Sequence, residues 1–465
     1  MALLSRTGDS PRTGIVHFGL GAFHRAHQAV YTEDAMAVAG GDWGIAAVAP
    51  RSADVVTALQ AQDRLYSVTS VSARGNETRV IGAFSEVHRA AADPDAVVAR
   101  LADPAVRVVT LTITEKGYHL DPVDGRLLAA GDLAADLETD RPPRTVPGLL
   151  VRGLAARRRA DAGPIAVVSC DTVPSNGRRT RDLVRQAVMH HDRPGLLDWI
   201  NEQVTFPGTM ADRIVPATTP AVLAVAERAL GCTDRAAVHA EPYSNWVIED
   251  DFPGGRPAWD LAGASFTDDT SAWERLKLRA LNGTHSGIAY LGALAGCPTV
   301  SAALQMPGLR EVMSRFLVAD VAPSLIPPDG ITAGAYGRQV LDRFANPAIE
   351  HRTVQIARDG SQKLPQRLLH TIADRRAAGA EPRWGAMMVA AWMRYTRGRA
   401  DDGSPLPLDD PLADEIRARQ ADLLTLRAVF PQSLAEDEVV RRLIDEWLAS
   451  FDKHGVAATV AGAAT

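Results

Sequence analysis

The sequence of 465 residues has few cysteines, no long hydrophobic run and no excess of positive charge, and each absence excludes a class of protein. Its three cysteines, Cys170, Cys232 and Cys297, are far apart and form neither a disulfide framework nor a metal-binding spacing. No apolar run approaches the length of a membrane span, and the first residues lack the apolar core of a signal peptide. The formal net charge of -6 gives no sign of a nucleic-acid partner. We therefore expect a soluble cytoplasmic protein with neither a nucleic-acid nor a membrane partner.

Lysine is also scarce, because only four of the 50 basic residues are lysines. Arginine stays protonated at any accessible pH, whereas a buried lysine can lose its proton near neutrality. A chain that otherwise uses arginine has lysine either where the chemistry requires it or by chance. The candidates are Lys116, Lys277, Lys363 and Lys453, and three of them fall in the motifs described below.

Two regions with different patterns follow one another along the chain. In the first, short apolar runs alternate with helical patterns, which predicts a parallel sheet with helical crossovers. From about Ser271 onward, long amphipathic stretches dominate, and the Asp and Ser residues of 265–272 suit a helix start. We predict an α/β domain over residues 1–270 and a mainly helical domain over 271–465, with a frayed C-terminal tail. The predicted strands are 14–19, 43–49, 106–114 and 164–170, and one predicted helix is 95–103.

A glycine turn after the first predicted strand is the candidate dinucleotide site. Gly19 and Gly21 follow a strand and precede a predicted helix, so they permit a tight turn and the close approach of a pyrophosphate, with Phe23 beside them. His24 replaces the third glycine of the usual pattern, and an ordinary glycine turn is the alternative interpretation. Arg51, near the end of the second strand, either meets a 2′-phosphate or is a solvated loop residue. We expect NAD as the cofactor and do not exclude NADP.

The segment 277–285 carries the main candidate chemistry. At about 100° per residue, Lys277, Asn282 and His285 of an α-helix fall within an arc of about 140°. Transfer of a hydride from a secondary alcohol requires a proton acceptor and donors that stabilise the oxyanion. A desolvated lysine can be the base, and asparagine and histidine can be the donors. The alternative interpretation is a helix surface with a solvated lysine.

Seven ordered motifs together show a specific resemblance. The sequence resembles the mannitol dehydrogenase family, the long-chain polyol dehydrogenases that include mannitol 2-dehydrogenase and fructuronate reductase, from about Gly14 to beyond Arg367. This resemblance implies a Rossmann-type N-terminal domain with a parallel-sheet core and a mainly α-helical C-terminal domain. The motifs are GLGAFHRAHQA at 19–29, TEKGYHLDP at 114–122, SCDTVPSNG at 169–177, FPGTMADRIVP at 206–216, EPYSNWVIEDDF at 241–252, KLRALNGTHS at 277–286 and DGSQKLPQRLL at 359–369.

The resemblance also implies roles for residues of the lysine segment and of the third motif. Lys277 corresponds to the general base of alcohol oxidation, Asn282 to a donor of the oxyanion pocket, and His285 to a residue that binds or orients a substrate hydroxyl. The family has a second oxyanion asparagine where this sequence has Thr172, which offers one hydroxyl donor in place of an amide. Asn176, four residues on, either reaches the substrate or caps a turn.

Further site residues come from the other motifs. The resemblance implies that Asp212 acts near the lysine; the alternative is that Asp212 forms an ion pair with Arg213. It also implies that Glu115 connects the lysine to solvent; the alternative is that Glu115 is a carboxylate at the start of a helix. Arg352 and Lys363 lie in a segment expected near the substrate, where they suit a carboxylate or several hydroxyls.

The expected function is that of a metal-independent, NAD(P)-dependent oxidoreductase. It would transfer a hydride between nicotinamide and C2 of a linear ketose/polyol or hexuronate/aldonate pair, such as fructose/mannitol or fructuronate/mannonate. The alternatives are a mannitol-1-phosphate or arabinitol-type dehydrogenase, a non-catalytic dinucleotide sensor, and a metal-dependent enzyme. The pair His190-His191 has no carboxylate or cysteine at useful spacing, so we expect no metal site. The expected assembly is a monomer or weak homo-oligomer.

Overall fold

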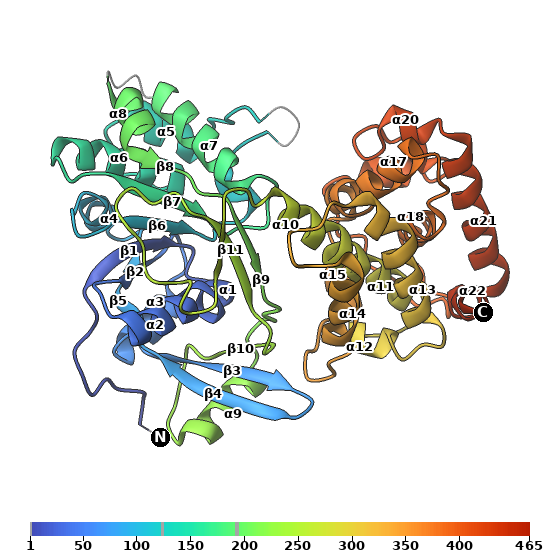
Figure 1. Ribbon diagram of the computed structural model, residues 1–465, viewed down its shortest axis with the longest axis horizontal. Helices are drawn as coiled ribbons and strands as arrows, with labels where there is room; N and C mark the ends of the chain where they lie inside the picture. The colour runs from blue at the N-terminus through green and yellow to red at the C-terminus, as the bar shows by residue number, and fades with distance from the viewer. Residues whose placement is uncertain (1, 122–124, 191–194) are drawn as a thin grey trace. The chain divides into compact units, whose positions relative to one another are not determined.

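A computed structural model describes residues 2–121, 125–190 and 195–465 (Figure 1). The chain divides into two compact units between Ser271 and Ala272, called unit 1 and unit 2 below. Within the described residues, no helix combines the length and apolar character needed to span a membrane.

Unit 1 is built on a six-stranded sheet in which every pair of neighbours is parallel. The strand order is β5-β2-β1-β6-β7-β8, which is the doubly wound order 3-2-1-4-5-6 when the six strands are numbered along the chain. Nearly every residue of the central strands is buried, as expected for a parallel sheet covered on both faces. The predicted fold class is therefore confirmed. The strands are β1 (Thr13–Phe18), β2 (Gly44–Ala49), β5 (Phe84–Arg89), β6 (Val108–Leu111), β7 (Ile165–Ser169) and β8 (Val204–Thr205).

Successive side chains of each strand enter two different hydrophobic cores. Ile15 packs in one core, and Val16 and Phe18 pack in the other. The first core takes residues from α1 (Ala22–Ala26), α2 (Gln28–Ala39) and α3 (Asp54–Ala61). The second takes residues from α4 (Pro94–Leu101), α5 (Gly131–Glu138), α6 (Val146–Arg159), α7 (Asn176–His190) and α8 (Leu196–Gln203).

Two small three-stranded sheets, which the sequence did not predict, extend unit 1. One joins β10 (Val238–Ala240) to the hairpin β3 (Tyr66–Ser72) and β4 (Gly75–Ile81). The other joins β12 (Ser265–Thr267), β11 (Asn245–Glu249) and β9 (Thr209–Asp212). The remaining elements of unit 1 are η1 (Glu115–Tyr118) and α9 (Pro220–Leu230).

Unit 2 is helical, and its central helix α11 (Gly283–Leu294) is buried at every position. The helix α18 (Arg383–Tyr395) packs against both α11 and α21 (Glu438–His454). The other elements are α10 (Ser271–Leu276), η2 (Lys277–Asn282), α12 (Val300–Ala303), α13 (Leu309–Arg315), η3 (Phe316–Val321), η4 (Ala322–Ser324), α14 (Ala333–Phe344), α15 (Thr353–Ile356), α16 (Gly360–Leu364), η5 (Pro365–Leu369), α17 (His370–Ala377), α19 (Ala413–Ala418), η6 (Leu423–Thr425), α20 (Gln432–Ala435) and α22 (Val456–Ala464).

Three segments of unit 2 are π-helical, and one of them contacts both of the others. They are η2, η3 and η5, and η2 packs against both of the others. Pro365 begins η5; a proline inside a helix has no N–H to donate and clashes with the preceding turn, which explains the wider turn there. A Cβ on Gly283, directly after η2, would lie 2.7 Å from the carbonyl oxygen of Arg367 in η5. Glycine therefore permits the close approach of the two turns.

Two details of the predicted elements are wrong. The predicted helix after the glycine turn is interrupted at His27, whose φ of -128° and ψ of -90° separate α1 from α2. The tail expected to fray is the helix α22, in which Val456 and Val460 are fully buried. Arg315 fixes its end by donating to the carbonyl oxygens of Ala463 and Ala464 at 2.9 and 2.8 Å.

Candidate active site

The glycine turn lies at the carboxyl end of β1, where the strand order changes direction and open parallel sheets bind their ligands. Gly19 has a φ of 108°, and a Cβ there would lie 1.9 Å from the carbonyl oxygen of Thr112. The Gly19 N–H donates to the Val48 oxygen at 3.0 Å, and the Thr112 hydroxyl donates to the Gly19 oxygen at 2.7 Å. Glycine is therefore required for both the backbone conformation and the close packing of this turn.

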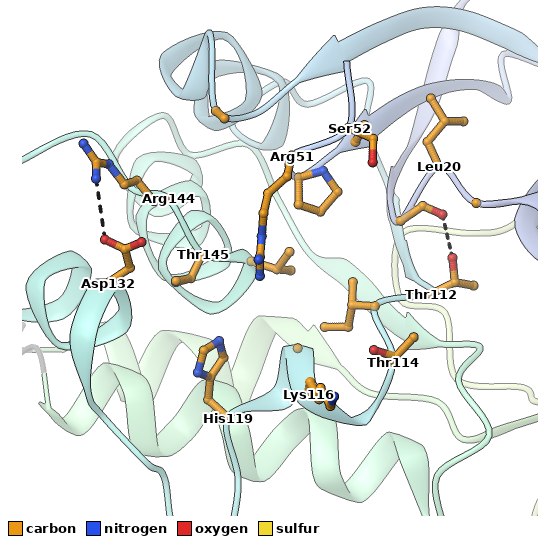
Figure 2. A pocket seen from close by; sticks show the side chains of 18 residues that line it. Leu20, Arg51, Ser52, Thr112, Thr114, Lys116, His119, Asp132, Arg144 and Thr145 are labelled. Atoms are coloured by element: carbon orange, nitrogen blue, oxygen red, sulfur yellow. Dashed lines mark hydrogen bonds and ion pairs between the residues drawn. The ribbon is translucent and has the colours of Figure 1, made fainter. Parts of the chain in front are cut away.

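A cavity of about 880 Å3 opens at this edge of unit 1. Its walls come from the turn after β1, the end of β2, the segment after β6 and the start of α6 (Figure 2). A Cβ on Gly21 would meet nothing nearer than the Gly19 oxygen at 3.9 Å, so a side chain there would project into open space. The volume suits a dinucleotide, since cofactor pockets measure about 300–1,000 Å3.

Three of the five residues predicted to bind the cofactor line this cavity, namely Gly19, Gly21 and Arg51. The cavity is also lined by Lys116 and His119, which the sequence had not assigned to the cofactor. Both belong to the segment after β6, whose shape depends on two residues with positive φ, Thr114 at 62° and His119 at 49°. No sequence pattern marks such conformations for residues other than glycine, which explains why this wall was missed.

Phe23 and His24, which were also predicted to bind the cofactor, do not line this cavity. His24 is buried, and its ring stacks on that of His17 with centroids 3.3 Å apart. Burial, and then the neighbouring His17, lower the pKa of His24 well below its usual value. Where the usual pattern has a third glycine, this chain therefore fills the core with a neutral aromatic ring.

The half-buried carboxylate of Asp171 holds the segment that carries Lys116 and His119. Its oxygens accept hydrogen bonds from the Ile113 and Thr114 N–H groups at 3.0 and 2.9 Å and from the Tyr118 hydroxyl at 2.9 Å. Burial raises the pKa of Asp171 to about 6, because its effect exceeds that of the hydrogen bonds, which lower the pKa. No role was predicted for Asp171, and its hydrogen bonds to the backbone of this segment make it a positioning residue for the cavity wall.

The two candidate substrate residues of the third motif have different surroundings. Thr172 is exposed. Asn176 is buried, and its Nδ2 donates to the carbonyl oxygens of Asp171 and Thr209 at 3.1 and 2.8 Å, while its Oδ1 accepts from the Thr209 N–H at 2.9 Å. Asn176 therefore joins the start of α7 to β9, and both of its amide N–H groups are used in these contacts.

The predicted acidic residues also differ in burial. Asp212 is buried at the end of β9, where it lies opposite Asn245 in the antiparallel pairing of β9 with β11. Its neighbour Arg213 donates to the carbonyl oxygens of Ala26 and Glu241, so the guanidinium has a structural role. Glu115 is exposed at the start of η1, close enough to Asp171 to raise the pKa of that carboxyl.

In unit 2, the predicted triplet Lys277, Asn282 and His285 is buried. Lys277 and Asn282 are the first and last residues of the π-turn η2, and His285 lies in the first turn of α11. The α-helical angle assumed for the whole segment is therefore wrong. A turn closed by bonds between residues five apart brings Lys277 and Asn282 onto the same side of the helix. Single π-turns occur frequently at functional sites.

Asn282 and His285 each have a buried nitrogen with no hydrogen-bond partner among the described residues, namely Nδ2 and Nε2. Such groups are rare in folded proteins and call for a ligand or an ordered water. The His285 ring stacks on Phe344 with centroids 4.5 Å apart. Burial, followed by the nearby His351, lowers the pKa of His285 well below its usual value, so the imidazole is neutral at physiological pH.

Several cations surround His285, and three of them also lower its pKa: Arg367, Lys363 and Arg343. Arg343 is buried, and Arg367 donates to the Ser286 hydroxyl at 3.1 Å. The Lys363 ammonium donates to the carbonyl oxygen of Ile356 at 3.4 Å. The sequence missed Arg343, although an arginine on the apolar side of an amphipathic helix is a readable signal.

The other predicted substrate residue, Arg352, is exposed, and its backbone bridges to Thr299. Among the described residues no group of three or more His, Cys, Asp or Glu side chains has the arrangement of a metal site. His190 lies 3.3 Å from a Glu138 oxygen, and His191 lies outside the described residues.

Comparisons with known proteins cover nearly the whole chain. The family model for the mannitol dehydrogenase Rossmann domain matches residues 13–261, and that for the mannitol dehydrogenase C-terminal domain matches residues 269–447. The uncharacterised oxidoreductase YeiQ of Escherichia coli (strain K12) is 41% identical, over 95% of this chain and 93% of YeiQ. D-mannonate oxidoreductase of the same organism is 39% identical, over 91% of this chain and 90% of its own length.

A solved structure is also similar to the whole chain. It is the Pseudomonas fluorescens mannitol 2-dehydrogenase in a ternary complex with NAD and D-mannitol. It has 34% sequence identity and a TM-score of 0.88, and the match covers 99% of this chain and 96% of that one.

Proposed function

Because the chain belongs to the mannitol dehydrogenase family and is an oxidoreductase, we propose that it transfers a hydride between NAD(H) and C2 of a linear sugar derivative, with Lys277 as the general acid/base. One observation carries the proposal. Lys277 shares a buried π-turn with Asn282, and the Asn282 amide has an N–H group without a partner among the described residues. A proton acceptor beside a free donor is what oxidation of an alcohol requires.

The nucleotide cavity of unit 1 fits the cofactor. Gly21 leaves the turn open where a side chain would fill the cavity, and Lys116 supplies positive charge for phosphate groups. A bound nicotinamide cofactor would supply the hydride acceptor for oxidation of the alcohol and the hydride donor for reduction of the ketone. The relative with NAD in its complex supports this assignment.

The proton steps fall to residues of unit 2. In oxidation, Lys277 Nζ takes the proton of the C2 hydroxyl; in reduction it returns the proton to the oxygen at C2. The Asn282 amide donates a hydrogen bond to this oxygen as negative charge develops on it. Neutral His285 orients a neighbouring hydroxyl through Nε2, as donor or acceptor according to its tautomer. Asp212 and Glu115 are proposed to act on the protonation of Lys277, and Thr172 to supply the hydroxyl donor that stands in for the family's second asparagine.

The charge around His285 favours a substrate with a carboxylate. Arg343, Arg367 and Lys363 all approach this histidine, and arginine binds carboxylates in a fixed, two-pronged geometry. A hexuronate/aldonate pair such as fructuronate/mannonate fits this charge, and one relative acts as a D-mannonate oxidoreductase. Arg352 is proposed to contact the same end of the substrate. Fructose/mannitol is the second candidate, favoured by the mannitol in the similar ternary complex.

We also propose that the enzyme needs no metal, that it is cytoplasmic, and that it is a monomer or a weak homo-oligomer. The three cysteines among the described residues are free, which suits a reducing compartment. Dialysis against a strong chelator is expected to leave the rate unchanged, and loss of activity that zinc restores would contradict metal independence.

The deciding experiment measures initial rates with NADH and NADPH against fructose, fructuronate, tagaturonate and fructose 6-phosphate. Lys277→Ala is expected to lower kcat/KM by about 10²–10⁴-fold, the range of general acid–base catalysis. Lys453→Ala, which removes a lysine near the end of α21, is the matched control and is expected to keep the full rate. Equal rates for both variants would refute the role of Lys277. Dinucleotide binding without turnover of any ketose would instead support the sensor alternative.

A further inference from the structure

The adenosine end of the nucleotide cavity has an unusual composition for an NAD site. In such sites a carboxylate near the end of the second strand binds the ribose 2′-hydroxyl, and its charge repels a 2′-phosphate. The segment after β2 lines the cavity here, and it consists of Pro50, Arg51 and Ser52. Asp54, the next acidic residue, begins α3, is exposed and does not line the cavity.

Arg51 itself is positioned to meet a ligand. Its side chain extends from the end of β2 into the cavity, toward the side where Thr145 and His119 lie (Figure 2). Its charge is close enough to His119 to contribute to the lowered pKa of that imidazole, after burial. Many arginines of this chain are held in ion pairs, whereas Arg51 has no hydrogen bond or ion pair with another described residue.

The remaining charges of the cavity add to this positive field. Arg144 and Lys116 line it, and among the described lining residues Asp132 is the one carboxylate. Asp132 lies 3.0 Å from the Arg141 guanidinium and 3.6 Å from that of Arg144, so its charge is already balanced. No lining carboxylate is therefore left to repel an additional phosphate.

We propose that Arg51 and Ser52 form a phosphate subsite at the adenosine end of the cavity, so that this chain binds NADP(H) at least as tightly as NAD(H). The guanidinium pairs with the 2′-phosphate of the ribose, and the Ser52 hydroxyl donates a further hydrogen bond. The inference rests on the proposed function, because it assumes that the cavity holds a dinucleotide.

The test measures binding to the full chain by calorimetry, without turnover. Adenosine 2′,5′-bisphosphate and 5′-AMP differ only in the 2′-phosphate. We expect the bisphosphate to bind at least tenfold more tightly, and this ratio to fall as salt rises. Arg51→Ala is expected to bring the ratio close to one, and Arg51→Asp to reverse it. Arg74→Ala, which removes an exposed arginine of the β3–β4 turn, is the matched charge control and is expected to keep the ratio.

The outcomes separate the subsite from the proposed function. Tighter binding of 5′-AMP than of the bisphosphate, or a ratio that Arg51→Ala leaves unchanged, would overturn the subsite. Binding of NADH, measured by its fluorescence in the same samples, would then show that the cavity still binds a dinucleotide. Absence of binding by NADH, NADPH and both adenosine phosphates would overturn the subsite together with the proposed function.

Discussion

Gly19 and Gly21 lie two residues apart in the same turn, yet the structure predicts opposite effects for their substitution. Gly19→Ala would place a Cβ 1.9 Å from the Thr112 oxygen on a backbone with a φ of 108°. The left-handed conformation costs roughly 1–2 kcal/mol for a residue with a Cβ. Displacing packed backbone adds roughly 1–3 kcal/mol. We therefore expect Gly19→Ala to lower the free energy of unfolding of unit 1 by about 2–5 kcal/mol.

Gly21→Val is expected to spare stability and impair binding. Gly21 has a φ of -84° and a ψ of 176°, a conformation that valine adopts readily. The nearest heavy atom to the added Cβ would be the Gly19 oxygen, 3.9 Å away, so the free energy of unfolding should change by no more than about 0.5 kcal/mol. The two methyl groups would occupy the cavity, and we expect the Kd for NADH to rise at least tenfold, about 1.4 kcal/mol.

Two assays on both variants decide the matter. Urea unfolding followed by tryptophan fluorescence reports stability, and NADH fluorescence titration reports affinity. NADH binding by Gly21→Val with the wild-type Kd, or unfolding of Gly19→Ala at the wild-type urea concentration, would refute these expectations. Either result would mean that the turn moves freely enough to accept a side chain.

Three further predictions concern unit 2. Arg343→Met is expected to raise KM for fructuronate more than for fructose, because it removes a buried cation near His285; an equal rise for both would argue against a carboxylate subsite. His285→Gln is expected to lower kcat/KM about tenfold without moving the acid limb of the pH–rate profile, because a histidine with a strongly lowered pKa does not titrate there; a shifted limb would contradict this. Val460→Ala is expected to lower the free energy of unfolding by about 1–3 kcal/mol, because Val460 is fully buried in α22. An unchanged free energy in urea unfolding would instead support the prediction that the C-terminal tail is frayed.

The sequence predicted the features that depend on local patterns. The central strands are continuous apolar runs, so their alternation with helices indicated the parallel sheet, and β7 (Ile165–Ser169) lies within its predicted range. Gly19 and Gly21 were readable because the turn follows a strand and precedes a helix. The order of the strands was not readable, since it depends on which strands pair across long crossovers.

The missed features depend on conformations and contacts that have no local signature. The π-turn at Lys277–Asn282 contains no proline and reads as an ordinary helix, although it decides how Lys277 and Asn282 are oriented. Asn176 was predicted either to reach the substrate or to cap a turn. One of its partners, Thr209 of β9, lies more than thirty residues away along the chain, and no local pattern indicates that contact. The tail α22 is rich in alanine, and only its packing against Gly308 and Arg315 shows why it is helical.

Asp171 gives a pH-dependent test of the cavity wall. Its pKa is about 6 in the folded chain, raised by burial from 3.8, so between these values the folded state binds more protons than the unfolded state. Stability contributed by the protonated carboxyl is therefore present below pH 3.8 and is lost as the pH rises to about 6. The shift corresponds to about 3 kcal/mol, which Asp171→Asn should remove from the pH dependence of unfolding.

Asp320 of unit 2 is the matched control. It is a buried carboxylate that accepts from the Gly385 N–H at 2.7 Å, and burial raises its pKa to about 6 as well. Both Asp→Asn variants are expected to flatten the stability profile between pH 4 and 6. Only Asp171→Asn should weaken NADH binding, because only Asp171 holds the backbone of Ile113 and Thr114 at the cavity. Equal NADH affinity in the two variants would show that the wall keeps its shape without the carboxylate, and Asp171 would then have no role in positioning.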